Sequence, residues 1–289
     1  MLKIVFLISL ISFSSNSFAL SKIGHQVVCQ LAFDHLSPFK QQQVVYLLNN
    51  IARPDKKAIN RYNNNNSNEA ISFADACTWA DAIKNNTEYA LYKSWHYINV
   101  ARNTRRVDSS TCLKNCLPRA ILFHQRQLTQ KNISSVKIRA LMFLGHWLGD
   151  IHQPLHVSFS DDAGGNKIKI RGSTGGCSNL HALWDRCLLS PGDQHTVKAL
   201  VEKLKNQWPY MPNSRWYDDA VWAWANESLA LVKQASFLYC EMSRDGFCHK
   251  PSTSVLILRQ NYHDKYRPIL EQRLLKAAIR LSYVLEHSL

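Results

Sequence analysis

The chain has 289 residues, of which 46% are hydrophobic, and its formal charge is +14. This length is enough for one large domain with a substantial core, and the absence of repeats and linkers argues against a repeat protein or several domains. The charge favours polyanionic partners such as nucleic acid or an anionic membrane, although an ordinary soluble surface can carry the same charge.

The first 19 residues have the features of a secretory signal peptide. Lys3 precedes an apolar run from Ile4 to Phe13, and Ser17-Phe18-Ala19 forms a small-residue cleavage site. The run is too short to span a bilayer comfortably, and no later segment approaches the length of a membrane helix. We therefore expect a soluble, exported protein, periplasmic or secreted, whose mature chain begins at Leu20 and carries a charge of +13 because only Lys3 is lost.

Apolar periodicity in the mature chain, residues 20–289, predicts mainly helices. Residues 164–172 alternate polar and apolar side chains between glycines, which predicts a short strand of a β-hairpin. The Asn-rich run 60–68 predicts a surface loop. The expected fold is mainly α, a single-domain multi-helix bundle with one short hairpin. In chain order the predicted helices are 24–50 with an interruption at Ser37-Pro38, 71–84, 118–130, 137–151, 181–189, 216–236 and 268–286.

Eight cysteines in an exported chain predict disulfides. Short spacings suggest local pairs and leave Cys29 and Cys77 to join two helices. Eight cysteines allow about 105 connectivities, so this scheme is one of many. A zinc site made of thiolates is the less favoured alternative, because there is no C-x2-C motif. The local pairs are Cys112 with Cys116, Cys177 with Cys187, and Cys240 with Cys248.

Two His/Asp pairs are the most informative feature of the chain. His146 and Asp150 are four residues apart, as are His181 and Asp185, so on a helix each pair shares one face and can close on a metal ion. One such pair is more often a surface contact. The residues around His146 are apolar, however, which indicates a core-facing helix whose buried polar groups need partners. Together the pairs predict a site for several metal ions, with His156 turned toward it beyond Pro154.

An ordered set of motifs resembles the zinc-dependent S1/P1 nucleases, a family in the same superfamily as bacterial zinc phospholipase C. The resemblance covers nearly all of the chain from Leu20 and implies the mainly α fold of that superfamily. It also implies hydrolysis of single-stranded DNA and RNA to 5′-mononucleotides, and action on 3′-nucleotides as a 3′-nucleotidase. The motifs are G-H at Gly24, W-A-D at Trp79, W-H-Y-I-N at Trp95, G-H-x-x-G-D-x-H-Q-P-L-H at Gly145, G-G-N at Gly164, N-L-H-x-x-W-D at Asn179 and W-A-N-E-S at Trp224.

The resemblance also implies a cluster of three Zn²⁺ ions. A first zinc would take Asp81, His96, His146 and Asp150. A second would share Asp150 and add His25 with the backbone nitrogen and oxygen of Leu20, where the family usually has Trp; a third would take His156, His181 and Asp185. Two zincs bridged by Asp150 would activate a water molecule, and the third would stabilise the departing 3′ oxygen.

Four further positions match family residues that contact substrate. Lys84 and Asn99 match catalytic or transition-state contacts, and Tyr97 and Asn166 match residues of a nucleobase pocket. Surface, turn or core roles explain these four residues about equally well.

Two rival functions use the same residues. A zinc phospholipase C would bind similar metals, but that subgroup typically has Glu where this chain has Asp185. A non-catalytic basic protein would bind polyanions and merely store zinc. No sequence feature indicates stable membrane association or a protein partner.

Overall fold

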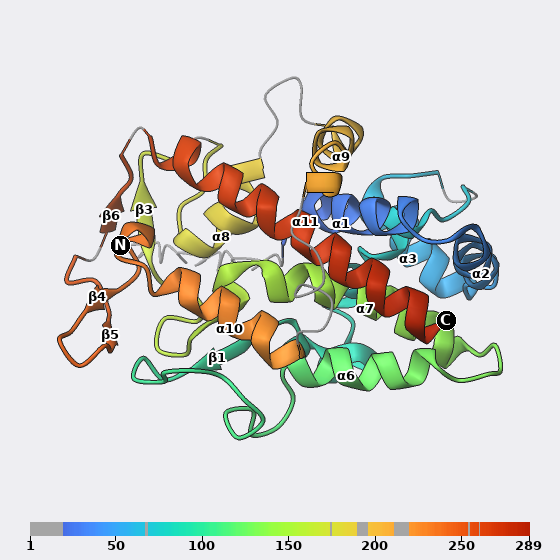
Figure 1. Cartoon of the computed structure of the whole chain (residues 1–289), viewed down its shortest axis with the longest axis horizontal. Helices are drawn as coiled ribbons and strands as arrows, with labels where there is room; N and C mark the ends of the chain where they lie inside the picture. Colours follow the sequence, from blue (N-terminus) through green and yellow to red (C-terminus); the bar gives the residue numbers. More distant parts are fainter. Residues whose placement is uncertain are drawn as a thin grey trace, which may run out of the picture.

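A computed structural model describes residues 20–66, 69–173, 175–189, 196–210, 220–253, 255–259 and 261–289. The predicted signal peptide, residues 1–19, lies outside these ranges. Within them, no helix combines the length and the apolar character that crossing a membrane requires. The predicted mainly α class is confirmed (Figure 1).

Helix α7 (Ser135–His152) forms the centre of the core. From Ile138 to His152 every residue except Arg139 is buried, as expected of a helix that neighbours cover on all sides. It ends two residues before Pro154, as the sequence predicts. The helices that pack against it include α1 (Lys22–Asp34), α6 (Leu117–Leu128), α10 (Val221–Val232) and α11 (Tyr262–Ser288), and Figure 1 shows α11 crossing over α7.

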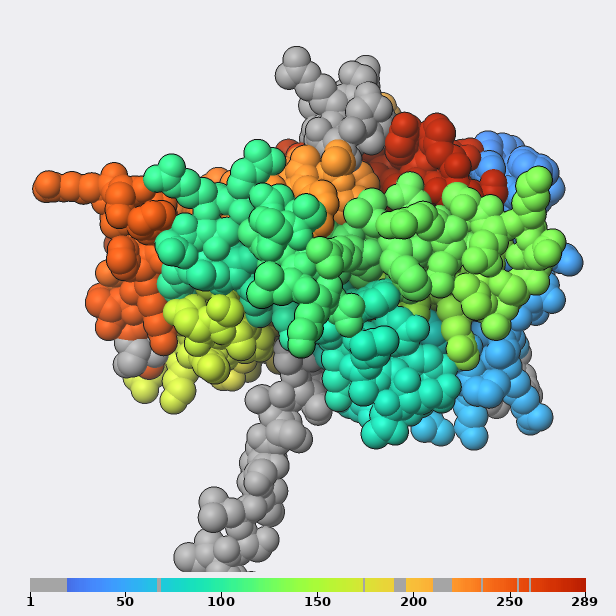
Figure 2. All heavy atoms as spheres, turned by 90° about the horizontal axis from the view of Figure 1, so that it is seen from below, coloured from blue at the N-terminus to red at the C-terminus, as the bar shows by residue number. Residues whose placement is uncertain are grey.

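The segment after α1 differs from its prediction in two places. The predicted helix 71–84 is two short helices, α4 (Phe73–Ala76) and α5 (Trp79–Ile83), because the Thr78 hydroxyl donates to the Asp75 carbonyl at 2.7 Å and competes with helical bonding. The Asn-rich run is not all loop, since Asn60 and Asn63 are buried in the last turn of α3. The other elements here are α2 (Pro38–Asn49), α3 (Arg53–Asn63) and the 3-10 segment η1 (Thr87–His96), which forms a bulge in the view of Figure 2.

Three later helices also have bounds that differ from the prediction. The predicted helix 181–189 divides into α8 (Leu180–Asp185) and η3 (Cys187–Leu189), and α10 is shorter than 216–236, of which residues 216–219 lie outside the described ranges. Helix α11 begins six residues before Pro268, because the buried rings of Tyr262 and Tyr266 hold its first turns in the core. The remaining short elements are η2 (Pro154–His156), α9 (Val197–Lys205), η4 (Trp208–Tyr210) and η6 (Ala235–Phe237).

Short strands pair in ways that local sequence does not reveal. The strand predicted within 164–172 is present as β3 (Lys169–Arg171), but its partner strand is β6 (Val255–Ile257), with which it pairs in parallel. On the side where a hairpin partner is expected, β3 forms an antiparallel bridge between Lys169 and Asn179. A real hairpin joins β4 (Glu241–Met242) to β5 (Cys248–His249). Strand β1 (Ile98–Val100) pairs in parallel with β2 (Val157–Phe159), with Ile98 opposite Val157. This pairing brings the residues after His96 beside those after His156.

All four predicted disulfides are present, so a thiolate zinc site is excluded. The Cys29–Cys77 bond lies between α1 and the end of α4 and touches α7 at Gly145. A Cβ atom at Gly145 would lie 2.1 Å from the Cys77 Sγ and 2.7 Å from the Cys29 Sγ. Only glycine lets α7 approach the disulfide this closely, and His146 is the next residue.

Candidate metal centre

Eight buried histidine and aspartate side chains converge from six elements. None has more than 8% of its surface exposed. Helix α7 supplies two of them and α8 another two, while α1, α5, η1 and η2 supply one each. They are His25, Asp81, His96, His146, Asp150, His156, His181 and Asp185, the eight side chains named in the predicted metal site.

Asp150 is the hub of this cluster. Its Oδ1 lies 3.4 Å from His25 Nε2 and 3.3 Å from His156 Nδ1. Its Oδ2 lies 3.0 Å from His96 Nδ1 and 3.3 Å from His146 Nε2. One carboxylate therefore faces four imidazoles, and its two oxygens lie toward different sets of potential ligands.

Two groups on one side of Asp150 could each hold a cation. The ligand atoms of His25, Asp81 and His146 lie within 4.8 Å of one another, and so do those of His96, His146 and Asp150. The expected sets place Asp81 with His96 and give His25 a separate ion. In the structure His146 belongs to both groups, and its ring stacks on that of His25 with centroids 3.7 Å apart.

A third group contains the three residues that the sequence predicts. His156 Nε2 lies 3.4 Å from Asp185 Oδ1, and His181 Nε2 lies 3.1 Å from Asp185 Oδ2. The fully buried Gln153 donates from Nε2 to Asp185 Oδ1 at 2.5 Å, and its own Oε1 accepts from the Leu155 amide at 2.5 Å. Gln153 thereby fixes the carboxylate that faces both imidazoles.

Backbone carbonyls orient three of the imidazoles. The Nδ1 atoms of His146, His156 and His181 lie 2.7–2.8 Å from the carbonyl oxygens of Cys77, His96 and Gly164. With Nδ1–H donating to a carbonyl, each ring directs its Nε2 toward the cluster, where a metal can bind it in place of a proton. Metal-binding histidines usually have an outer partner of this kind.

Side chains of α10 and α11 form hydrogen bonds with the C-terminal end of α7. Ser228 of the W-A-N-E-S motif donates to the Ile151 carbonyl at 2.6 Å, and Arg273 Nε donates to the His152 carbonyl at 3.0 Å. Glu227 lies between Arg273 and Arg280 and accepts from both. These bonds satisfy carbonyls that a helix leaves free at its C-terminus, and they fix the turn that carries Asp150.

Several buried polar atoms of the cluster have no hydrogen-bond partner within the described part of the chain. Such atoms are costly unless something satisfies them. Nitrogen and carboxylate oxygen donors of this kind suit zinc, so the residues fit the expected metal. The atoms are both ring nitrogens of His25, Asp81 Oδ1, Asp150 Oδ1, His156 Nε2 and Asp185 Oδ2.

Burial and mutual charge set the protonation of the cluster. Burial alone would raise the pKa of Asp150, but His146 and His156 outweigh it and hold that pKa well below its usual range. Burial would lower the pKa of His156, yet Asp150 and Asp185 raise it to about 9. Burial dominates at His96 and lowers its pKa to about 4. Asp150 is thus ionised and His96 is neutral, as metal ligands must be, whereas His156 carries a proton that a metal has to displace.

Leu20 is fully buried against two glycines beside the cluster. A Cβ at Gly24 would lie 2.6 Å from Leu20 Cγ, and one at Gly149 would lie 2.6 Å from His25 Nδ1 and 3.3 Å from Leu20 Cδ2. The Ser21 amide donates to the Asp185 carbonyl at 2.8 Å. The side chain of Leu20 thus fills a closely fitted space, although Leu stands where Trp is usual in the family it resembles.

The four predicted substrate residues lie in different settings. Lys84 Nζ is 3.7 Å from Asp81 Oδ1. The Asn99 Oδ1 is buried without a hydrogen-bond partner in the described chain and faces Gly164, whose carbonyl orients His181. Tyr97 is 41% exposed, and the amide nitrogen of Asn166 donates to the Ala163 carbonyl at 2.8 Å within the same loop as Gly164. Lys84 and Asn99 therefore adjoin the cluster most directly.

Two residues of the site escaped the sequence prediction. Gln153 stands inside the H-Q-P-L-H motif, so its place between two predicted ligands could have marked it. Tyr62 donates to Asp81 Oδ2 at 3.4 Å, but it lies in the Asn-rich run that reads as a loop. No sequence signal distinguishes it there.

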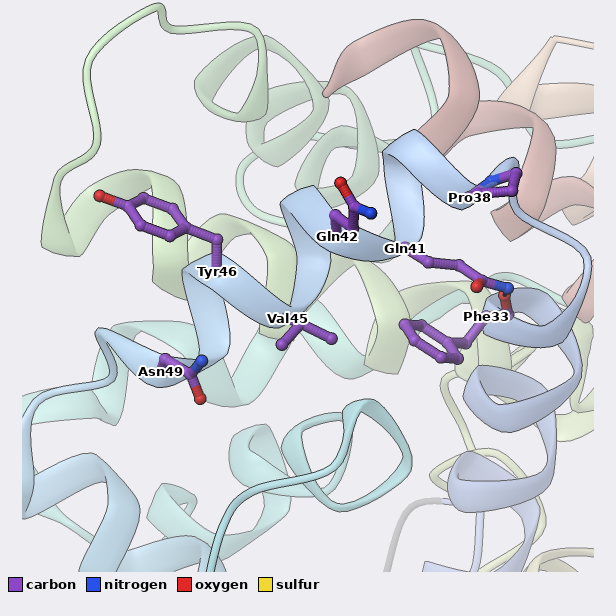
Figure 3. Close-up of a pocket in the computed structure, with 7 residues that line it drawn as sticks. All are labelled: Phe33, Pro38, Gln41, Gln42, Val45, Tyr46 and Asn49. Carbon is purple, nitrogen blue, oxygen red and sulfur yellow. Dashed lines mark hydrogen bonds between the residues drawn. The ribbon is translucent and has the colours of Figure 1, made fainter.

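A shallow hollow of about 460 Å³ lies elsewhere, on the surface of α2 (Figure 3). It is lined by Phe33 of α1 and by six residues from Pro38 to Asn49, none of which belongs to the cluster. Figure 3 shows polar and apolar side chains side by side along it, without converging charges. It offers nothing for the chemistry of the cluster.

Comparison with known proteins identifies related nucleases. A family model described as S1/P1 Nuclease matches residues 20–289. Endonuclease 5 of Arabidopsis thaliana is 28% identical over 91% of this chain and 88% of its own length. Nuclease S1 of Aspergillus oryzae is 28% identical over 72% of this chain and 76% of its own length. Nuclease P1 of Penicillium citrinum is 32% identical over 41% of this chain and 46% of its own length.

Proposed function

Because the chain belongs to the S1/P1 nuclease family, and is therefore a hydrolase of phosphodiester bonds in nucleic acid, we propose that it is an exported, zinc-dependent enzyme. It cleaves single-stranded DNA and RNA to 5′-mononucleotides and also removes the phosphate of 3′-nucleotides. The observation that carries this proposal is the set of buried nitrogen and carboxylate atoms around Asp150 that have no hydrogen-bond partner among the described residues.

Three zinc ions are held by the eight clustered side chains and by the backbone of Leu20. Zinc supplies Lewis acidity and lets water act as a nucleophile near neutral pH. Asp150 joins the two parts of the centre, and Gln153 keeps the Asp185 carboxylate directed at His156 and His181. The catalytic domain comprises residues 20–289.

The polar residues next to the cluster bind and orient the phosphate. The Lys84 ammonium group, beside Asp81, provides positive charge where the phosphate oxygens gain negative charge in the transition state. The Asn99 side chain lies beside Gly164, whose carbonyl orients His181, and its amide nitrogen is the group that can donate to a phosphate oxygen. Both are catalytic residues in this proposal because they contact the substrate.

An exposed base is held next to the cluster. Tyr97 follows His96 directly and presents a ring that is partly open to solvent, on which an unpaired base can stack. Asn166 lies in the loop whose Gly164 orients His181 and provides polar contacts. A duplex keeps its bases stacked, which accounts for the preference for single strands.

Removal of the signal peptide completes the site. In the precursor the nitrogen of Leu20 is an amide, which is a poor ligand, whereas cleavage converts it to an amine. The four disulfides suit the oxidising compartment that an exported chain enters. A protein with even one additional residue before Leu20 should bind less zinc than the processed one.

The test is release of acid-soluble 5′-mononucleotides from single-stranded DNA by protein that begins at Leu20. We expect chelation to stop release, added zinc to restore it, and His146→Ala to abolish it. No release by the zinc-loaded protein would overturn the proposal. Phosphatidylcholine is the comparison substrate, and its hydrolysis in place of DNA would assign the centre to a phospholipase.

A further inference from the structure

Helix α3 has one buried and one exposed face. Asp55 and Ile59 point into the molecule. Three cationic side chains, Arg53, Lys57 and Arg61, are exposed and follow one another at four-residue intervals. On a helix this spacing aligns them in one row, which we call the α3 stripe, with about 6 Å between successive residues along the axis.

The charges of the α3 stripe are not paired with other side chains in the described part of the protein. None of its three side chains forms a salt bridge or hydrogen bond with a described residue. The one carboxylate on α3, that of Asp55, lies on the buried face and accepts from Arg139 Nε at 3.0 Å. The helix thus pairs its inner charge and leaves three outer charges available to a ligand.

The C-terminal end of α3 adjoins the metal centre. Tyr62, next to Arg61, donates to Asp81 Oδ2 at 3.4 Å. Asn63 donates to the Thr78 hydroxyl at 2.9 Å, and α3 packs against α5, the helix that carries Asp81. The α3 stripe therefore begins at Arg61, next in sequence to the residue that contacts Asp81, and extends for about 12 Å along the helix axis to Arg53.

A row of cations that has no salt-bridge partner among the described residues, and whose end is near a phosphodiesterase centre, suits a polyanion. We propose that the α3 stripe binds the phosphates of a single-stranded nucleic acid beyond the nucleotides held at the metal centre. Its spacing is comparable with that of successive phosphates in an extended strand, and phosphate contacts position a strand without reading its bases. The inference rests on the proposed nuclease function and adds an interaction surface for long substrates.

The experiment compares the triple variant Arg53→Gln, Lys57→Gln and Arg61→Gln with a control that loses the same charge. The control, Lys131→Gln, Lys198→Gln and Arg244→Gln, removes three exposed cations scattered over separate parts of the molecule. Each protein is assayed on a thymidine oligonucleotide about twenty residues long and on bis(4-nitrophenyl) phosphate, between about 50 and 200 mM salt.

We expect the stripe variant to lose about tenfold or more in kcat/KM on the oligonucleotide at low salt, with little change on the small diester. The slope of log kcat/KM against log salt should become shallower by about 2, because each phosphate contact on a single strand contributes about 0.7. The control variant should keep the wild-type slope.

The assays distinguish failure of the α3-stripe inference from failure of the proposed nuclease function. If both variants lose the same activity on the oligonucleotide, net charge is responsible and the stripe is not a binding surface. If the stripe variant keeps its slope, or loses the two substrates equally, the inference is wrong while the nuclease function stands. If the wild type hydrolyses neither substrate, the proposed function itself has failed.

Discussion

Asp150 faces four imidazoles, so both parts of the centre depend on one carboxylate. We expect Asp150→Asn to lower zinc affinity by more than about a hundredfold, since losing an outer partner of a ligand alone costs about ten- to a hundredfold. Metal analysis after dialysis checks this, with circular dichroism to confirm the helical fold. Full zinc content in the folded variant would show that Asp150 is not the hub.

His156 predicts a pH dependence of zinc binding. Asp150 and Asp185 outweigh burial and raise its pKa to about 9, so the zinc-free protein carries this proton at neutral pH. Zinc must displace it, and affinity at the third group should fall by about tenfold for each pH unit below about 9. Calorimetry in buffers of different ionisation enthalpy measures the released proton. Binding without proton release near pH 7 would contradict this assignment.

Gln153 is a positioning residue for Asp185. Replacing it with Leu keeps an apolar body of similar length but removes the donor to Asp185 Oδ1, so we expect about a ten- to hundredfold loss of zinc affinity at the third group. Competition with a chromogenic chelator reports this. Gln41→Leu removes a comparable bond, to the Phe33 carbonyl at 2.9 Å, away from the centre and should leave zinc affinity unchanged.

At the scale of elements, the Cys29–Cys77 bond connects α1 and α4 where they meet α7. We expect replacement of both cysteines with alanine to cost about 4 kcal/mol of unfolding free energy, given the 48-residue separation. Zinc content should fall too, because the Cys77 carbonyl orients His146.

Replacing Cys240 and Cys248 provides the control for the loss of the Cys29–Cys77 disulfide. Their separation is only eight residues and they lie outside the cluster, so chemical denaturation should show a loss of about 2 to 3 kcal/mol with zinc retained. An equal loss of zinc in both variants would mean that the disulfides act only through global stability.

The elements that sequence predicted well are those with a long, locally readable pattern. The predicted helices 118–130 and 137–151 correspond to α6 and α7 within two residues at each end. The break at Thr78 depends on a hydroxyl hydrogen bond, and the pairing of β3 depends on a partner strand far along the chain. Neither the hydroxyl bond nor the distant partner strand changes the hydrophobic periodicity of the sequence. The elements α3, η1 and α9 were not predicted either.

At the scale of the whole molecule, zinc should stabilise the fold as well as support catalysis. The centre joins six elements, and it gathers three carboxylates, those of Asp81, Asp150 and Asp185, which repel one another without cations. Zinc at a thousand times its dissociation constant adds about 4 kcal/mol, which for a protein of this size raises Tm by about 10 °C. Calorimetry with and without chelator measures the shift, and an unchanged Tm would refute it.

The candidate site was largely predictable from sequence because its eight side chains lie in short motifs that keep a fixed order. What could not be predicted depends on distant packing. Tyr62 reaches Asp81 only because α3 lies on α5, and Leu20 fits only because Gly24 and Gly149 leave room for it. The same packing of α3 on α5 supports the α3 stripe as a binding surface. The spacing of its three cations alone would be ordinary for any solvent-facing helix.

The contact between the Cys29–Cys77 disulfide and Gly145 also bears on how a cell can make such an enzyme and survive. In a reducing cytoplasm the two thiols stay unbonded, and separate sulfur atoms need more room than a bonded pair, where Gly145 already touches both. We expect the reduced thiols to displace helix α7 and to weaken the contact between His146 and the Cys77 carbonyl. The nuclease activity that we propose should therefore arise only after export, which would spare the nucleic acids of the producing cell.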